Sequence, residues 1–474
     1  MDLISLVVKG LDLLGLLPRT SLAPRTWQHP APASRKSSFR AATIPLVMLS
    51  LLIPEHAMGQ ASGTVVDLYT NRPIEGAIVT LGDDVVQTDE KGIFDMNVEG
   101  DRLAVRAHGY LKAEQILTGP QEIKLVPFTP KALYLSFYGI GHRGLRESAL
   151  QLIEETELNA LVIDVKGDRG MITYKSSIPL ASEVGAQKVI IVKDMSDLMK
   201  SLRETGIYTI ARIVVFKDSP LALKRPDLAV RTGSGEIWRD REKLAWVDPF
   251  KREVWDYNIN IAIEAAQYGF DEIQFDYVRF PDTSAPQFSM PNTAKNRVEA
   301  ISGFLMEAKN RLVPHNVFLA ADIFGYVGWN LNDTQIGQKL EALAPHLDYI
   351  SPMLYPSGFQ FGIPGCKNPV ENPYDIVYRS LKRAQERIDF SPVRFRPWLQ
   401  AFKDYAFDRR KFAGKEIKDQ IDAAEDFGSN GWMLWNPRNC YDGDGLRKIH
   451  WVNYFFPPTP EKIVRIRTYK DGSS

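Results

Sequence analysis

From residue 132 onward, short apolar runs alternate with longer amphipathic stretches. The apolar runs have the length of strands, and the longer stretches carry apolar residues at helical spacing, as with Leu150, Ile153 and Leu158. This alternation is typical of a parallel sheet whose strands are joined by helices. The predicted strands are 132–138, 160–165, 208–215, 272–277, 317–323, 349–354, 394–401 and 431–435. The predicted helices are 147–156, 195–205, 254–268, 296–311, 375–387 and 417–427.

Eight strand candidates predict a closed (β/α)8 barrel with enlarged loops. A doubly wound open sheet would also alternate strands and helices. However, the glycines of 139–144, which follow the first strand, lack the spacing of a dinucleotide-binding turn. We therefore predict an α/β fold, a (β/α)8 TIM barrel, over residues 132–457, with a C-terminal tail over 458–474.

The segment before the barrel has a different pattern. Over residues 60–127, short alternating strands are separated by turns rich in Asn, Asp and Gly, without a convincing helix. This pattern predicts a small all-β sandwich. Residues 128–131, which contain Pro130, form the expected linker between the two domains.

The first 59 residues have the organisation of an export signal with an N-terminal extension. Basic residues precede an apolar run over 41–53, and Ala57-Met58-Gly59 then offers small residues at the spacing of a signal peptidase site. The apolar run is too short to span a bilayer comfortably, so cleavage near Gly59 is favoured over anchoring. We expect an exported protein, periplasmic, envelope-associated or secreted, without stable membrane insertion after cleavage.

Composition narrows the class of partner. Lys and Arg together number 58, as do Asp and Glu, so the sequence indicates no overall attraction to nucleic acid or acidic membranes. Aromatic residues make up 11% of the chain, which favours a neutral, amphipathic ligand such as a carbohydrate, although aromatic side chains also fill cores. The two cysteines, Cys366 and Cys440, permit one disulfide in an exported protein, and the sequence leaves their pairing open.

Polar residues recur where the predicted strands end. The carboxyl ends of the strands are the place where parallel barrels carry their chemistry. A single polar residue there is usually a helix cap or part of an ion pair, but a recurring set predicts a polar pocket. The set comprises Asp164, Lys166, Arg212, Asp276, Arg279, Asp322, Tyr355, Gln400 and Asn436, and Asp218 also follows the third strand.

The residue types in this set favour one kind of catalysis. No pair of histidines in the barrel has the spacing of metal ligands, no serine lies in a nucleophile elbow, and phosphate-binding glycines are lacking, so we expect neither metal nor cofactor. Two carboxylates on neighbouring strands are the minimum apparatus of glycoside hydrolysis. Asp276 and Asp322 are the predicted pair, and we expect the other members of the set to position substrate.

A long polar excursion after the third strand carries Trp238 and Trp246. Long loops in compact domains often bind ligands, so these two residues are the preferred candidates for stacking on sugar rings. Trp329, Trp398 and Trp435 are further candidates. For each of them taken singly, packing in the core is the simpler interpretation.

Two family resemblances add to this interpretation. The turns at 73–77, 88–94 and 108–110 resemble those of the carboxypeptidase regulatory-like domain, which implies an accessory, noncatalytic role. The barrel resembles the bacterial "putative glycoside hydrolase domain" family of the domain-of-unknown-function class, which is distantly similar to α-amylase-like barrels. The motifs that carry this resemblance are 161–168, 269–281, 321–326, 349–356 and 431–436.

The second resemblance implies sugar hydrolysis and roles for individual residues. In α-amylase-like barrels an Asp that ends the fourth strand is the nucleophile, and Asp276 matches it. The acid is a Glu that ends the fifth strand, where this chain has Asp322, and an Arg precedes the nucleophile by two residues, where this chain has Gln274. The alternative hypothesis is a noncatalytic glycan-binding or envelope-scaffolding protein on the same fold.

Overall fold

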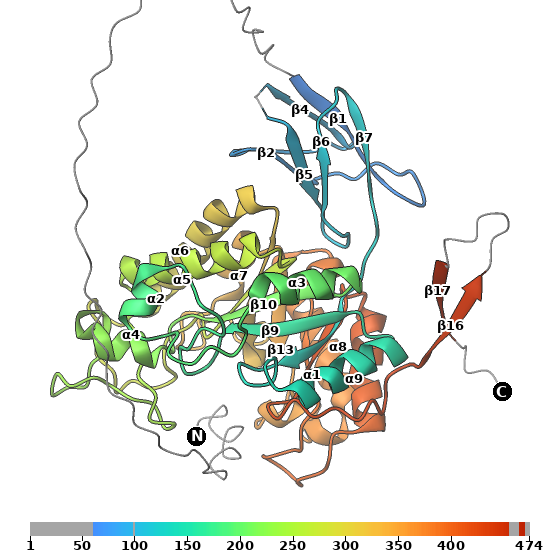
Figure 1. Ribbon diagram of the computed structural model, residues 1–474. Coiled ribbons are helices and arrows are strands. Elements are labelled where there is room, and N and C mark those ends of the chain that lie inside the picture. The colour runs from blue at the N-terminus through green and yellow to red at the C-terminus, as the bar shows by residue number, and fades with distance from the viewer. Residues whose placement is uncertain (1–59, 98–99, 455–463, 470–474) are drawn as a thin grey trace, which may run out of the picture.

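The computed structural model describes residues 60–97, 100–454 and 464–469 (Figure 1). The predicted signal peptide and most of the predicted tail lie outside the described residues. The described end of the chain contains an antiparallel hairpin of β16 (Ile449–Tyr454) and β17 (Val464–Tyr469), which the sequence pattern did not predict.

Eight parallel strands close into a barrel, so the predicted (β/α)8 fold is confirmed. The barrel closes because β15 pairs with β8 as well as with β14. Every predicted strand is present. The strands are β8 (Lys131–Leu135), β9 (Ala160–Lys166), β10 (Tyr208–Val214), β11 (Glu272–Asp276), β12 (Phe318–Phe324), β13 (Tyr349–Met353), β14 (Trp398–Gln400) and β15 (Trp432–Trp435).

Helices surround the barrel, and each begins or ends at a recognisable signal. His142 caps α1 by accepting a hydrogen bond from the Leu145 amide, and Gly428 ends α9 in the left-handed conformation. The six predicted helices are α1 (Arg143–Glu155), α3 (Met195–Glu204), α5 (Arg252–Gln267), α6 (Ala294–Leu312), α8 (Pro373–Ile388) and α9 (Gly414–Phe427). Three short helices were not predicted: α2 (Pro179–Glu183), α4 (Ser219–Lys224) and α7 (Leu340–Leu343).

The interior of the barrel is filled, not hollow. Small and aromatic side chains from alternate positions of the strands form one buried cluster, which includes Ala160, Tyr208, Phe318 and Met433. At the end where the strands begin, the fully buried Arg396 and Glu272 form an ion pair. Only the opposite end, where the strands finish, is left for a polar site.

The predicted small all-β unit is confirmed as two sheets with their own core. One sheet has the order β4-β1-β7, the other β3-β2-β5-β6, and Val65, Phe94 and Leu103 are buried between them. The strands are β1 (Gln60–Asp67), β2 (Ile78–Leu81), β3 (Asp84–Gln87), β4 (Ile93–Asn97), β5 (Arg102–Arg106), β6 (Ala113–Ile116) and β7 (Gln121–Leu125).

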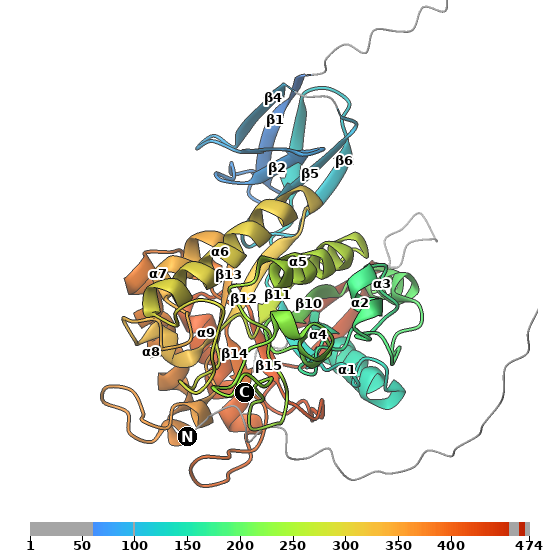
Figure 2. The same cartoon turned by 90° about the vertical axis from the view of Figure 1, so that its left-hand side faces the viewer.

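This β unit lies against the end of the barrel at which the strands begin (Figures 1 and 2). The Gly109 amide donates to the hydroxyl of Tyr349, the first residue of β13, over 3.0 Å. Lys112 Nζ donates to the carbonyl of Phe270, just ahead of β11, over 2.8 Å. The mouth formed by the carboxyl ends of the strands therefore faces away from the β unit.

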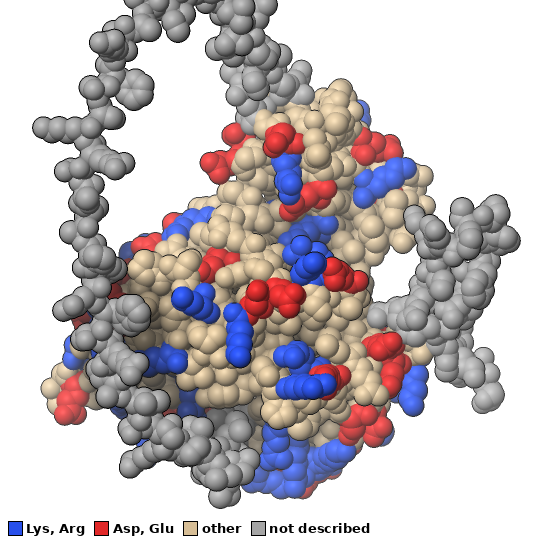
Figure 3. Space-filling model, in the orientation of Figure 1, with Lys and Arg blue, Asp and Glu red and all other residues tan. Residues whose placement is uncertain are grey.

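Three further findings concern the surface charge, the cysteines and the lengths of the helices. On the face in Figure 3, positive and negative side chains are interspersed over both units, without one sign dominating. Cys366 is buried and Cys440 is exposed, and both are free thiols, so the disulfide that the sequence permitted is not formed. Within the described part of the chain, no helix is both long and apolar enough to cross a bilayer.

Candidate active site

Arg212 lies at the centre of the barrel mouth and binds three carboxylates. Its Nη1 donates to Asp164 Oδ1 over 2.7 Å, its Nη2 to Asp168 Oδ1 over 2.8 Å, and its Nε to Asp276 Oδ2 over 2.9 Å. The side chain is 1% exposed, and its guanidinium also lies 5.0 Å from the centre of the Trp435 ring. One buried cation thus holds together residues from β9, from the loop after it and from β11.

Strand register explains why these residues meet. Arg212 of β10 pairs with Asp164 on one side and Gln274 on the other, and Val214 pairs with Asp276. Side chains at alternate positions of a strand point to the same face, so Asp276 and Gln274 share the interior. The pairing of β11 with β12 matches Phe275 to Ala321, which places the next residues, Asp276 and Asp322, beside each other at the mouth.

Asp322 is the more deeply buried member of this pair, with 1% of its surface exposed. Its Oδ1 accepts a hydrogen bond from Trp398 Nε1 over 2.7 Å. Burial raises the pKa of Asp322 well above its usual range, and the negative charge of Asp276 raises it further. The bond from Trp398 and the charge of Arg212 act in the opposite direction without overcoming these two effects.

Asp164 is also perturbed by its environment. Burial raises the pKa of Asp164 to about 6, although Arg212 lies beside it and favours the charged form. Its Oδ2 accepts hydrogen bonds from the Tyr134 hydroxyl over 2.8 Å and from the Phe137 amide over 2.9 Å. These contacts hold the Asp164 carboxyl in the position from which its Oδ1 accepts the hydrogen bond of Arg212.

Aromatic rings line the same mouth. Trp435 stacks on Tyr134 with 4.0 Å between ring centres, and Trp398 meets Trp435 edge to face at 5.3 Å. Tyr355 follows β13 at the same mouth, and burial and the charges of Asp322 and Asp276 raise the pKa of its hydroxyl. The structure therefore brings together Asp164, Arg212, Asp276, Asp322 and Tyr355 from the predicted set.

Lys166 is not brought to this cluster. A register shift between Arg212 and Ile213 turns the end of β9, and Lys166 is fully buried beneath α5. Its Nζ pairs with Asp218 Oδ2 at 2.6 Å and donates to Asn258 Oδ1 over 2.8 Å. The prediction that Lys166 contacts substrate conflicts with this placement, because a fully enclosed ion pair leaves no surface for a ligand.

Gln400 and Asn436 follow their strands as predicted but bind the protein's own loops. Gln400 is buried and donates to Ser357 Oγ over 2.7 Å. Asn436 Nδ2 donates to the carbonyls of Ala401 and Cys440, each over 2.7 Å. Both residues hold the loops that form the rim, and neither has a free amide hydrogen aimed at the mouth.

The tryptophan loop after β10 packs mainly on itself. Trp246 is 2% exposed and donates from Nε1 to Asp240 over 3.0 Å, while the half-buried Trp238 meets it at 6.3 Å. Arg279 is buried, with its guanidinium 5.1 Å from the centre of the Trp246 ring. This placement makes Trp246 and Arg279 supports of the loop and leaves only Trp238 partly accessible.

Sequence reasoning gave no role to three residues that organise the mouth. Asp168 and Tyr134 bind Arg212 and Asp164, as described above, and Lys217 Nζ pairs with Glu242 at 2.6 Å and lies over the Tyr277 ring. A signal existed for Tyr134, because its position alternates with Ala132 on the first strand. Lys217 follows an unbroken apolar run, and nothing in that pattern distinguishes it from a solvated lysine.

The comparison with protein families decides which group the chain belongs to. The model of the family described as "putative glycosyl hydrolase domain" matches residues 132–441, which is almost the whole barrel. The chain belongs to this family. The barrel is thus a glycosyl hydrolase-like domain, as the resemblance of its strand-end motifs implied. None of the curated proteins matches the chain.

Solved structures extend the comparison to the fold. A hypothetical protein from Ruminiclostridium thermocellum is 40% identical, with 40% of this chain and 96% of that one covered and a TM-score of 0.36. The glycoside hydrolase domain of PgaB (BpsB) from Bordetella bronchiseptica is 13% identical over 66% of this chain and 95% of that one, with a TM-score of 0.48. A chitinase from Chromobacterium violaceum is 12% identical over 67% and 96%, with a TM-score of 0.40.

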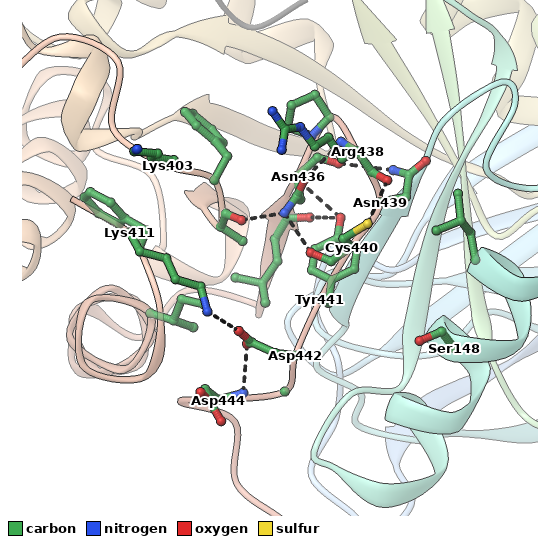
Figure 4. Close-up of a pocket in the computed structure, with 18 of the residues that line it drawn as sticks. Ser148, Lys403, Lys411, Asn436, Arg438, Asn439, Cys440, Tyr441, Asp442 and Asp444 are labelled. Atoms are coloured by element: carbon green, nitrogen blue, oxygen red, sulfur yellow. Dashed lines mark hydrogen bonds and ion pairs between the residues drawn. The ribbon is translucent and has the colours of Figure 1, made fainter. Parts of the chain in front are cut away.

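A side pocket of about 680 Å³ lies beside the mouth (Figure 4). The loops after β14 and β15 form most of its wall, and the first turns of α1 and α9 complete it. No group of three or more His, Cys, Asp or Glu residues suited to hold a metal ion occurs in the described ranges. At the mouth itself, the Arg212 guanidinium occupies the position between the carboxylates of Asp164, Asp168 and Asp276.

Proposed function

We propose that this protein is an exported glycoside hydrolase that cleaves O-glycosidic bonds of a polysaccharide or glycan with two carboxyl groups. Asp322 is the general acid, and Asp276 is the nucleophile or the general base. One observation carries the proposal: two neighbouring carboxyls at the mouth of a glycosyl hydrolase-like barrel have opposite environments. Environments of this kind are what divide the acid and base roles between paired carboxyls.

The environment of Asp322 suits a proton donor. A general acid has to hold its proton near neutral pH, and burial together with the charge of Asp276 raises the pKa of Asp322. Trp398 Nε1 occupies the Oδ1 oxygen, so the proton belongs on Oδ2. From there it would pass to the glycosidic oxygen as the bond breaks, which prevents a charged leaving group from forming.

The environment of Asp276 suits a nucleophile or base. Arg212 donates to its Oδ2 from two nitrogens, and the Tyr277 amide donates to its Oδ1 over 2.6 Å. The two bonds from the guanidinium orient the Asp276 carboxyl, and Oδ1, which accepts one hydrogen bond, has a second lone pair for the reaction. This oxygen would attack the anomeric carbon directly, or activate the water that does.

The proposal also covers the substrate, the role of the β unit and export. The partly exposed rings of Trp435 and Tyr355 at the mouth suit the C–H faces of sugar units, and a carbohydrate is the expected substrate. The β unit, whose turns resemble the carboxypeptidase regulatory-like domain, is an accessory unit. Export rests on the signal-like segment that ends near Gly59.

Asp276→Asn and Asp322→Asn test the catalytic roles. A screen of the protein against bacterial and plant polysaccharides identifies a substrate, and NMR of the released anomer gives the stereochemical course. Each variant should lower kcat by about 10²–10⁴-fold, because one positioned acid or base contributes about that much. Asp408→Asn, which removes an exposed carboxylate bonded to Arg410, is the control and should leave kcat unchanged.

The noncatalytic alternative predicts a different result. A glycan-binding or scaffolding protein would bind a polysaccharide without releasing sugar, and its affinity would survive both substitutions. Binding without turnover in the unsubstituted protein, across the whole screen, would therefore contradict the proposed hydrolysis.

A further inference from the structure

The side pocket lies next to the barrel mouth, and two contacts link residues of the two. Tyr355, which follows β13 at the mouth, meets the Phe402 ring at 5.5 Å, and Phe402 lines the pocket. Trp435 stacks at the mouth, and Asn436, the next residue, lines the pocket. A chain of sugar units that extends from the mouth over the loops after β14 and β15 would reach the pocket.

One wall of the pocket is suited to a sugar ring. Tyr405 is half-buried and lies nearly parallel to Phe402, with 6.1 Å between ring centres and 7° between the planes. Both residues line the pocket. A half-buried aromatic ring supported from behind by a second ring is a rigid surface on which the C–H face of a sugar can stack.

The charges of the pocket are separated. Lys403 and Arg438 are exposed cations that line it, and neither side chain forms an ion pair or hydrogen bond with any described residue. Figure 4 shows them on one side of the pocket, together with Asn436. Asp442 and Asp444 lie on the opposite side, where Lys411 Nζ pairs with Asp442 at 2.8 Å.

Other cations around the pocket have partners. Lys411, which also lines the pocket, and Lys415 and Lys418 of α9 each pair with a carboxylate. Lys403 and Arg438 instead present free donors on the side of the pocket that carries Asn436. An ammonium and a guanidinium together bind a carboxylate or a sulfate in preference to a neutral hydroxyl group.

We propose that this pocket binds a sugar unit that carries an anionic group, so that the substrate of the barrel is an acidic polysaccharide. The inference rests on the proposed glycoside hydrolysis and names the substrate class of the same site. The ring of the acidic unit stacks on Tyr405, and its carboxylate or sulfate contacts Lys403 and Arg438. The unit whose bond is cleaved lies at the mouth, beside Asp276 and Asp322.

Binding is measured by calorimetry in the Asp322→Asn background, which separates affinity from turnover. The probes are a galacturonic acid tetramer with its methyl ester, and a sulfated galactose tetramer with its unsulfated parent. The acidic form of at least one pair should bind about tenfold more tightly than its neutral form, because two exposed ion pairs contribute about that much. The difference should shrink at high salt. Comparing the two pairs distinguishes a carboxylate from a sulfate.

Lys403→Ala combined with Arg438→Ala should reduce the affinity for the acidic probe to that for the neutral probe. The matched control, Lys415→Ala with Lys418→Ala, removes two exposed lysines of α9 that lie outside the pocket and should change nothing. Equal binding of acidic and neutral probes, unchanged affinity in the Lys403/Arg438 variant, or no binding of any acidic probe would overturn the inference.

Failure of this inference differs from failure of the proposed function. Hydrolysis of neutral glycans alone, without preference for an acidic probe, would retain the two-carboxylate mechanism and reject the acidic substrate. Charge-dependent binding to Lys403 and Arg438, without any turnover by the unsubstituted protein, would retain the pocket and reject the enzyme.

Discussion

The position of an individual residue at the mouth could be predicted from the sequence where strand alternation alone determines which way its side chain points. Asp276 and Asp322 end apolar runs, and the register of neighbouring strands places them side by side. Lys166 has the same sequence signature, but an extra residue in its own strand, Val165, shifts the register just before it, and Lys166 is buried in an ion pair with Asp218. A local irregularity of pairing leaves no trace in the pattern of apolar residues, so this exception could not be foreseen.

Trp398→Phe tests whether the indole N–H controls the proton of Asp322. The hydrogen bond from Trp398 favours the charged form of Asp322, so its loss should raise the pKa of Asp322 further. A general acid is active while protonated, so activity should fall at a higher pH than in the unsubstituted protein. The buried oxygen also loses its partner, which should lower the free energy of unfolding by about 1–3 kcal/mol.

The pH profile of kcat/KM and denaturant unfolding measure these two effects. Trp432→Phe is the matched control, because Trp432 is also buried but its indole nitrogen lies beside Glu425, away from the mouth. Trp432→Phe should lower the free energy of unfolding and leave the pH profile of kcat/KM unchanged. An unchanged profile in Trp398→Phe would contradict the assignment of Asp322 as the acid.

For helices and strands, the boundaries predicted from the sequence agree with the structure where the hydrophobic periodicity extends over many residues. All eight strands of the barrel and six of its helices were predicted from the sequence. The four-residue α7 was not, because it is too short to show a helical period. The strand predicted over 394–401 is reduced to β14 (Trp398–Gln400), because residues 392–394 form a 3-10 turn and Pro397 precedes the strand. Proline and turn chemistry there outweighed β propensity.

Gly431→Ala should disturb closure of the barrel between β15 and the start of β8. Gly431 has φ +80°, and an added Cβ would lie 1.7 Å from the carbonyl oxygen of Pro130. Gly206→Ala is the matched control, because Gly206 has φ +72° but open space around it. The control should cost about 1 kcal/mol from backbone strain, and Gly431→Ala at least about 2 kcal/mol more from the clash. Equal losses in denaturant unfolding would contradict this account.

For the whole molecule, the contact between the β unit and the barrel depends on buried charge. Asp348 is buried, and although burial alone would raise its pKa, the hydrogen bond from His108 and the charge of Arg106 hold the pKa of Asp348 well below its usual range. A depressed pKa contributes stability above the unfolded value of about 3.9. That contribution is lost as the pH falls below about 4.

Asp348→Asn should therefore destabilise the protein at pH 7 and reduce its further loss of stability at pH 3. The expected cost at pH 7 is about 1–3 kcal/mol, because the buried Arg106 loses the nearby negative charge of Asp348. Glu122→Gln, which removes an exposed carboxylate paired with Lys124, should change neither value. Thermal unfolding at both pH values measures the difference, and an unaltered pH dependence would refute the role of Asp348.

The docking of the β unit has a geometric consequence for catalysis. Because the unit closes the pole at which the barrel strands start, it contributes no side chain to bond cleavage at the other pole. A polymer held by the β unit would have to bend around the outer helices to reach Asp276. A polymer that contacted both poles would therefore present a separate stretch to each of them.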